Sequence, residues 1–163
     1  MKVKKISVVV FLFSLLILPF QLRAQSENEL SFKDILNSKQ YIIEVRSAYP
    51  QSGRHINLTS TYSLIIKNDT IDSYLPYFGR AYSVPYGGGE GLIFQSQIKK
   101  YTVEKEKEDE IKIKIETVTP EDSYTYFISV YDNLSADISV HMNKRNSIRY
   151  QGSLEALSKQ SNL

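Results

Sequence analysis

The chain has 163 residues and contains no cysteine, with 20 lysines and arginines against 18 aspartates and glutamates. The missing cysteine excludes a disulfide framework, a thiolate nucleophile and a thiolate metal site. The length fits one ordinary domain that must rely on its hydrophobic core.

The first 24 residues have the pattern of a secretory signal peptide. Three lysines precede an apolar run from Ile6 to Phe20, and a small-residue cleavage site ends at Ala24. The fifteen residues of the run are fewer than the roughly 20 that a membrane-spanning helix needs. We expect residues 1–24 to be a signal peptide and residues 25–163 a single β-rich domain. That domain is expected in the periplasm or outside the cell, with no membrane span.

Cleavage of this leader would reverse the sign of the net charge. The leader carries four basic residues and no acidic ones, so 16 basic residues remain against 18 acidic ones. The basic surface expected of a nucleic-acid-binding protein is therefore missing, and nucleic acid is excluded as a partner.

One short helix is predicted directly after the leader. Ser26 and Glu29 have the spacing of a capping box, and Leu30, Ile35 and Leu36 can share one apolar stripe. We expect this helix to cover an open end or one face of the domain.

From Tyr41 onward, apolar and polar residues alternate with a period of two, which is typical of strands with one buried face. Short polar turns join these strands, so neighbours should be antiparallel. The predicted fold is mainly β, an antiparallel meander of about eight or nine strands closed as a barrel or a two-layer sandwich. In the first two strands the predicted inward residues are Ile43, Val45, Ser47, Ile56, Leu58, Ser60, Tyr62, Leu64 and Ile66.

The stretch SYLPYFGRAYSVPYGGGEG, residues 73–91, interrupts the alternation with five aromatic residues and five glycines. Pro76, Gly79 and Pro85 exclude a regular central strand, and the glycine run allows positive φ. Aromatic rings of this size each bury about 150 Å² or more, so the segment must pack against something.

This aromatic segment is the predicted ligand-binding site. The ligand-contacting set is Tyr77, Phe78, Arg80, Tyr82 and Tyr86, and the backbone-shaping set is Gly79, Gly87, Gly88 and Gly89. Tyrosine offers both an apolar ring and a hydrogen-bonding hydroxyl, which suits a glycan or a peptidoglycan fragment. Another envelope protein is a further candidate partner. The alternative is a structural or interaction scaffold, in which the rings plug one end of the fold and Arg80 pairs internally.

A carboxylate-dependent hydrolase is a second alternative. Asp72, Glu90 and Asp122 supply carboxylates, and only their separation could make two of them a glycosidase pair. His55 and His141 lie on polar strand faces without metal-ligand spacing. We therefore assign no catalytic residue, no metal and no cofactor, and we favour a non-enzymatic role.

The run from Tyr74 to Tyr82, followed by Pro85-Tyr86-Gly87-Gly88-Gly89, resembles an exported family of Bacteroides-type bacteria catalogued as domain of unknown function 4251. The resemblance covers about residues 30–155. It implies an envelope location and no particular activity. Asp69-Thr70-Ile71 is similar to the O-glycosylation sequon of such envelope proteins, which makes Thr70 a candidate modification site.

Overall fold

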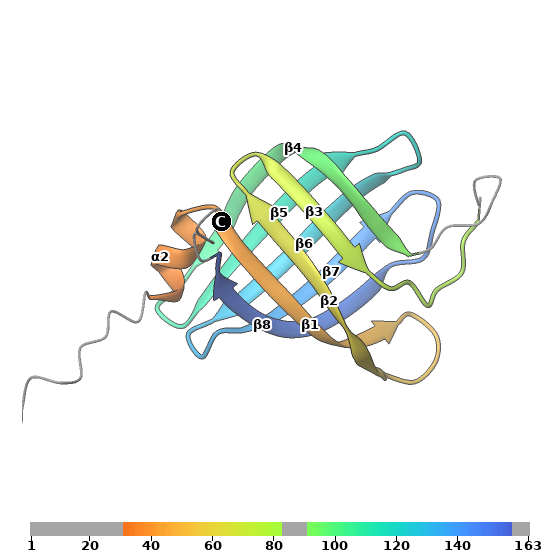
Figure 1. Cartoon of the computed structure of the whole chain (residues 1–163), viewed down its shortest axis with the longest axis horizontal. Helices are drawn as coiled ribbons and strands as arrows, with labels where there is room; N and C mark the ends of the chain where they lie inside the picture. The colour runs from red at the N-terminus through yellow and green to blue at the C-terminus, as the bar shows by residue number, and fades with distance from the viewer. Residues whose placement is uncertain (1–30, 83–90, 158–163) are drawn as a thin grey trace, which may run out of the picture. The chain divides into compact units, whose positions relative to one another are not determined.

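The computed structural model describes residues 31–82 and 91–157, which form a short helix and a closed antiparallel barrel (Figure 1). Each strand pairs with the next along the chain, and β8 pairs with β1 to close the barrel. The prediction of a mainly β meander is confirmed, and the closed barrel replaces the sandwich as the architecture. The elements are α2 (Phe32–Asn37), β1 (Gln40–Pro50), β2 (Ile56–Lys67), β3 (Thr70–Leu75), β4 (Leu92–Glu106), β5 (Glu110–Val118), β6 (Ser123–Tyr131), β7 (Ser135–Met142) and β8 (Ile148–Ala156).

The helix α2 begins after Ser31, whose side chain accepts a hydrogen bond from the Lys33 backbone N–H at 3.4 Å. Ile35 and Leu36 are buried, as their apolar spacing predicts, and Phe32 joins them. The predicted capping-box residues lie outside the described residues. In the described ranges, no helix is long and apolar enough to cross a membrane.

The barrel interior is filled by the inward side chains of all eight strands, and several of them are tyrosines. The hydroxyl of Tyr126 donates to Ser73 Oγ at 3.2 Å, and the Ser73 hydroxyl in turn donates to the Leu92 carbonyl at 2.8 Å. Tyr150 donates to the Pro76 carbonyl at 2.6 Å. Because buried polar groups are costly without a partner, these bonds allow large rings to fill the core without leaving unpaired hydroxyls.

These buried rings predict a step in alkaline titration. Burial raises the pKa of Tyr41, Tyr126 and Tyr150 well above the ordinary 10.0. Their neutral forms therefore stabilise the fold fully below pH 10, and this stability falls as the pH rises above that value. We expect ultraviolet absorbance to show Tyr41, Tyr126 and Tyr150 ionising only as circular dichroism reports unfolding. Ionisation of all twelve tyrosines in the folded state would contradict this prediction.

The prediction that Ser47 faces the core is wrong, because β1 contains a β-bulge. Val45 pairs with Gly152 and Ser47 with Gln151, so Arg46 is an extra residue in the ladder. The extra residue shifts the alternation by one, and Ala48 becomes the next buried position.

The first half of β2 also departs from regular alternation. Its pairing with β1 jumps from Val45 with Tyr62 to Ser47 with Asn57, so residues 58–61 lie opposite a single residue of β1. Ser60 is consequently exposed, which corrects its predicted inward position. Only the second half of the strand, around Leu64 and Ile66, contributes fully buried side chains.

Candidate functional site

Alternate connections of an up-and-down barrel lie at the same end. Here residues 51–55, 76–82, 119–122 and 143–147 lie at one end, which we call the loop end. The helix α2 precedes β1 at the opposite end (Figure 1). The described part of the predicted aromatic segment therefore belongs to the loop end.

Tyr77 is an internal structural residue of this segment. Its hydroxyl lies 2.8 Å from the Arg80 carbonyl and 2.9 Å from the Asn146 carbonyl, so it donates within the protein. The Arg145 guanidinium lies 5.4 Å from the centre of its ring. Burial raises the pKa of Tyr77, and the charge of Arg145 partly opposes that rise. The hydroxyl proton of Tyr77 is thus already used in hydrogen bonds to the backbone of the loop end.

A short antiparallel bridge fixes the backbone around Ala81. Ala81 pairs with Arg145, the Tyr82 N–H donates to the Lys144 carbonyl at 2.8 Å, and the Asn146 N–H donates to the Arg80 carbonyl at 2.9 Å. Residues 80–82 are therefore tied to the β7–β8 connection.

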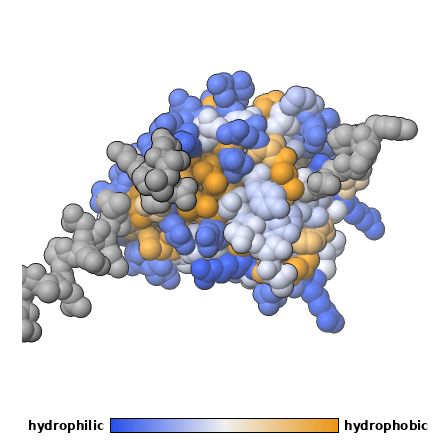
Figure 2. Space-filling view, viewed as in Figure 1, coloured by the Kyte–Doolittle hydropathy of each residue, from blue (hydrophilic) through white to orange (hydrophobic). Residues whose placement is uncertain are grey.

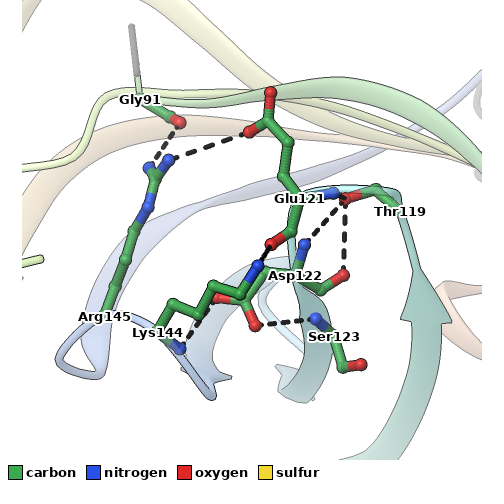
Figure 3. Close-up of polar contacts among 7 residues, drawn as sticks. All are labelled: Gly91, Thr119, Glu121, Asp122, Ser123, Lys144 and Arg145. Carbon is green, nitrogen blue, oxygen red and sulfur yellow. Dashed lines mark hydrogen bonds and ion pairs between the residues drawn. The ribbon is translucent and has the colours of Figure 1, made fainter. Parts of the chain in front are cut away.

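Arg145 is a buried residue that links three connections of the loop end through its contacts with Gly91 and Glu121 (Figure 3). Only 6% of this residue is exposed. Its Nη1 donates to the Gly91 carbonyl at 2.9 Å, and its Nη2 lies 3.9 Å from a Glu121 carboxylate oxygen. The sequence did not single out this residue, because it stands in the polar turn NKRN beside another cation.

Asp122, one of the carboxylates considered for hydrolysis, also holds the backbone of the loop end. One of its oxygens accepts from the backbone N–H groups of Ser123 at 2.8 Å and Asn143 at 3.2 Å. The other oxygen accepts from the backbone N–H of Lys144 at 3.0 Å, and Figure 3 shows the bonds to Ser123 and Lys144. The Thr119 hydroxyl oxygen accepts from the Asp122 N–H at 3.2 Å, which fixes the turn that holds this carboxylate. Asp122 is thus engaged on both oxygens. Glu90 lies outside the described residues.

Three of the predicted ligand-contacting residues project toward solvent. Tyr82 is 74% exposed and Phe78 is 43% exposed, and Arg80 is exposed as well. The Tyr82 hydroxyl donates to the Asn146 side chain, and the Arg80 guanidinium has no hydrogen-bonding or ionic partner within the described ranges. The predicted contributions of Tyr86, Gly87, Gly88 and Gly89 lie outside the described residues.

An aromatic surface on the adjoining wall lies outside the predicted ligand-contacting set. Tyr74 and Ile93 are paired on β3 and β4, and both are exposed. Tyr62 stacks on Tyr74 with ring centres 5.5 Å apart. On the face that carries β1 to β3, Figure 2 shows apolar side chains in separate patches among polar ones. Strand register places Tyr74 and Ile93 near the loop end, because they lie within two residues of where β3 ends and β4 begins.

Neither histidine has a metal-binding environment. His55 stacks on Tyr49 at 5.3 Å and bonds Asn57 at 2.8 Å, and His141 packs edge-on to Phe127 at 5.1 Å. Over the described ranges, no three His, Asp or Glu side chains are arranged to hold a metal ion.

Thr70, the predicted modification site, is the first residue of β3 and is half-buried. It pairs with Lys67 across the tight turn at Asn68, which has a φ of 56°. The turn position agrees with the predicted hairpin tip.

The fold and the loop end together define a small antiparallel β-barrel with one end fixed by side-chain-to-backbone bonds. The chain belongs to the family described as "Domain of unknown function (DUF4251)", whose model matches residues 23–154. A crystal structure of a DUF4251 family protein from Bacteroides eggerthii is similar, with a TM-score of 0.58 and 19% sequence identity. The similarity covers 78% of this chain and 86% of that one, and it supports the fold. No match was found among curated proteins.

Proposed function

We propose that the protein is an exported, non-catalytic binding module of the cell envelope that contacts its ligand through the loop end. Export is inferred from the signal-peptide pattern of residues 1–24. The main support for a binding role is that Phe78, Arg80 and Tyr82 are exposed on a segment whose backbone is held by the bridge between Ala81 and Arg145.

A fixed backbone favours binding because its ordering cost has already been met during folding. The Tyr77 hydroxyl and the bridge at Ala81 hold the segment, so the three exposed side chains start from a restricted geometry. Aromatic rings and arginine guanidinium groups are also the side chains that dominate binding energies at interfaces.

The ligand class that suits these groups is a glycan or a peptidoglycan fragment. The rings of Phe78 and Tyr82 can pack on the apolar face of a sugar, and Arg80 can donate several hydrogen bonds to hydroxyl or carboxylate oxygens. Another envelope protein remains the alternative partner, because aromatic and arginine side chains serve protein interfaces equally well.

An array of glycans and peptidoglycan fragments tests this proposal. We expect Arg80→Ala to weaken binding of the captured ligand about tenfold or more while thermal unfolding is unchanged, because the guanidinium has no hydrogen-bonding or ionic partner among the described residues. Arg54→Ala is the matched control, since Arg54 is also an exposed arginine at the loop end. Equal effects of the two substitutions, or no captured ligand, would contradict the proposal and favour a structural scaffold.

A hydrolase is less well supported. Asp122 is occupied by three backbone N–H groups, and Asp72 lies on β3 in the wall of the barrel. A glycosidase needs two carboxylates that face one another across a cleft. The Asp122 carboxylate instead accepts hydrogen bonds from the backbone, so it does not supply such a catalytic group.

A further inference from the structure

A concave surface lies on the outer wall of the barrel, across β6, β7, β8 and β1. It is a hollow of about 270 Å³, and its main lining residues are Tyr49, Phe127, Asp137, Ser139, Arg149 and Gln151. We call it the wall hollow. None of these residues belongs to the loop-end segment of residues 76–82.

Strand register explains why the hollow forms. Phe127, Ser139, Arg149 and Tyr49 are successive partners in one row across the four strands. The small Ser139 stands in this row between larger neighbours. Ser129, Asp137, Gln151 and Ser47 form the next outward row, which adds polar side chains beside Ser139. The polar residues of the two rows form the floor, and the rings of Phe127 and Tyr49 stand at the two ends of the first row.

The two aromatic walls of the hollow are held by other side chains. Phe127 packs edge-on to His141 at 5.1 Å between ring centres. Tyr49 stacks on His55 at 5.3 Å and donates its hydroxyl proton to Gln151 Oε1 at 2.5 Å. Fixed rings on either side of a polar floor suit a flat ligand with apolar faces.

A carboxylate and a guanidinium, those of Asp137 and Arg149, both line the wall hollow and are not paired with each other. Asp137 is half-buried, and its Oδ2 accepts a bond from the Tyr131 hydroxyl at 3.4 Å, while no bond to its Oδ1 is seen from the described residues. The Arg149 guanidinium lies 6.0 Å from the Tyr49 ring centre. Within the described part of the chain, Arg149 forms no ion pair with Asp137 or with any other carboxylate. An acceptor and a cation are therefore both available to a ligand.

The β1 bulge extends the wall hollow with a second arginine. A further hollow of about 330 Å³ shares Asp137 and Gln151 with the first, and it is lined by Arg46 and Ser47. The bulge places both of these residues opposite Gln151 instead of alternating them. Arg46 also has no ionic partner among the described residues, so the joined surface has a cation toward each end.

We propose that the wall hollow binds an acidic saccharide, a pyranose oligomer that carries carboxylate groups. Tyr49 and Phe127 would contact the apolar faces of a ring, and Asp137 and Gln151 would bind its hydroxyls. Arg149 and Arg46 would bind the carboxylates, to which guanidinium groups donate two parallel bonds. This proposal does not depend on the loop-end site, because the two sites share no residue.

Calorimetric titration with a hexuronic acid trisaccharide and its neutral hexose counterpart tests the proposal on the protein that begins at residue 25. We expect the acidic trisaccharide to bind at least tenfold more tightly than the neutral one. Arg149→Gln should remove most of that preference, and Phe127→Ala should weaken both ligands. Both positions are on the outer wall, and unchanged thermal unfolding of each variant will establish that it is folded.

Arg80→Gln is the control that separates the two sites, and it should leave binding of the acidic trisaccharide unchanged. Loss of binding in Arg80→Gln with full binding in Arg149→Gln would assign the ligand to the loop end and overturn the proposal. Equal affinity for the acidic and neutral trisaccharides, or no binding of either at about 1 mM, would overturn it as well.

Discussion

Replacing Gly152 by alanine should lower the free energy of unfolding by about 3 kcal/mol or more, the largest effect that we expect from a single methyl group. Gly152 lies on β8 opposite Val45, at the bulge of β1. An added Cβ would clash with the carbonyl oxygen of Glu44, and it would lie 2.8 Å from the carbonyl carbon and 3.1 Å from the Val45 Cα. Backbone atoms cannot rotate away as a side chain can, so the seam between β8 and β1 would have to open.

Urea and thermal unfolding of Gly152→Ala measure this effect, and the neighbouring Ser153→Ala is the matched control. The Ser153 hydroxyl is buried and has no hydrogen-bond partner among the described residues, so its removal should change stability by less than about 0.5 kcal/mol or increase it slightly. Equal stability of the two variants would show that β8 does not approach the bulge of β1 as closely as described.

Regular alternation made the strands predictable, because a side chain in a sheet can face only one of two sides. The same logic failed at Ser47. The residues around the bulge alternate in sequence as an unbroken strand does, and only their pairing with Gly152 and Gln151 shows the extra residue. A glycine within an otherwise regular strand was the one local signal, since such a glycine often marks a bulge or a close backbone approach.

The candidate site was predictable as a segment but not residue by residue. Composition shows that residues 73–91 must pack against something, yet Tyr77 and Tyr82 are the same residue type and have opposite roles. Their difference comes from Asn146 and Arg145, which the barrel topology brings to the same end from more than 60 positions away. The wall hollow was missed for a related reason, because its rows consist of residues on four strands that become neighbours only through register.

Replacing Asp122 by alanine should lower the free energy of unfolding by about 2–4 kcal/mol, the second large effect that we expect. Its carboxylate accepts three backbone N–H groups, two of which belong to Asn143 and Lys144 in the β7–β8 connection. Hydrogen bonds to charged groups contribute about 1.5–3 kcal/mol each, and their loss is partly offset by water that enters the loop. Asp122→Asn keeps one acceptor oxygen, so its free energy of unfolding should lie between those of the wild type and Asp122→Ala.

Amide hydrogen exchange locates the damage within the molecule. In Asp122→Ala, the amides of Asn143 and Lys144 should exchange faster than those at the opposite end of the barrel. Glu121→Ala is the control, because Glu121 is 57% exposed and its carboxylate lies 3.9 Å from Arg145, whereas the carboxylate of Asp122 accepts the amides of Asn143 and Lys144. If those two amides kept their protection in Asp122→Ala, the carboxylate would not hold the connection.

The same variant also tests whether the loop end acts as a fixed platform. Residues 80–82 are bonded to residues 144–146, so loosening the β7–β8 connection removes the support of Arg80 and Tyr82 without altering either side chain. A ligand captured at the loop end should then bind Asp122→Ala more weakly and Glu121→Ala as wild type, below the unfolding temperature of both. Unchanged affinity in Asp122→Ala would mean that binding does not require a fixed backbone, and the argument from pre-organisation would fail even if Arg80 contacts the ligand.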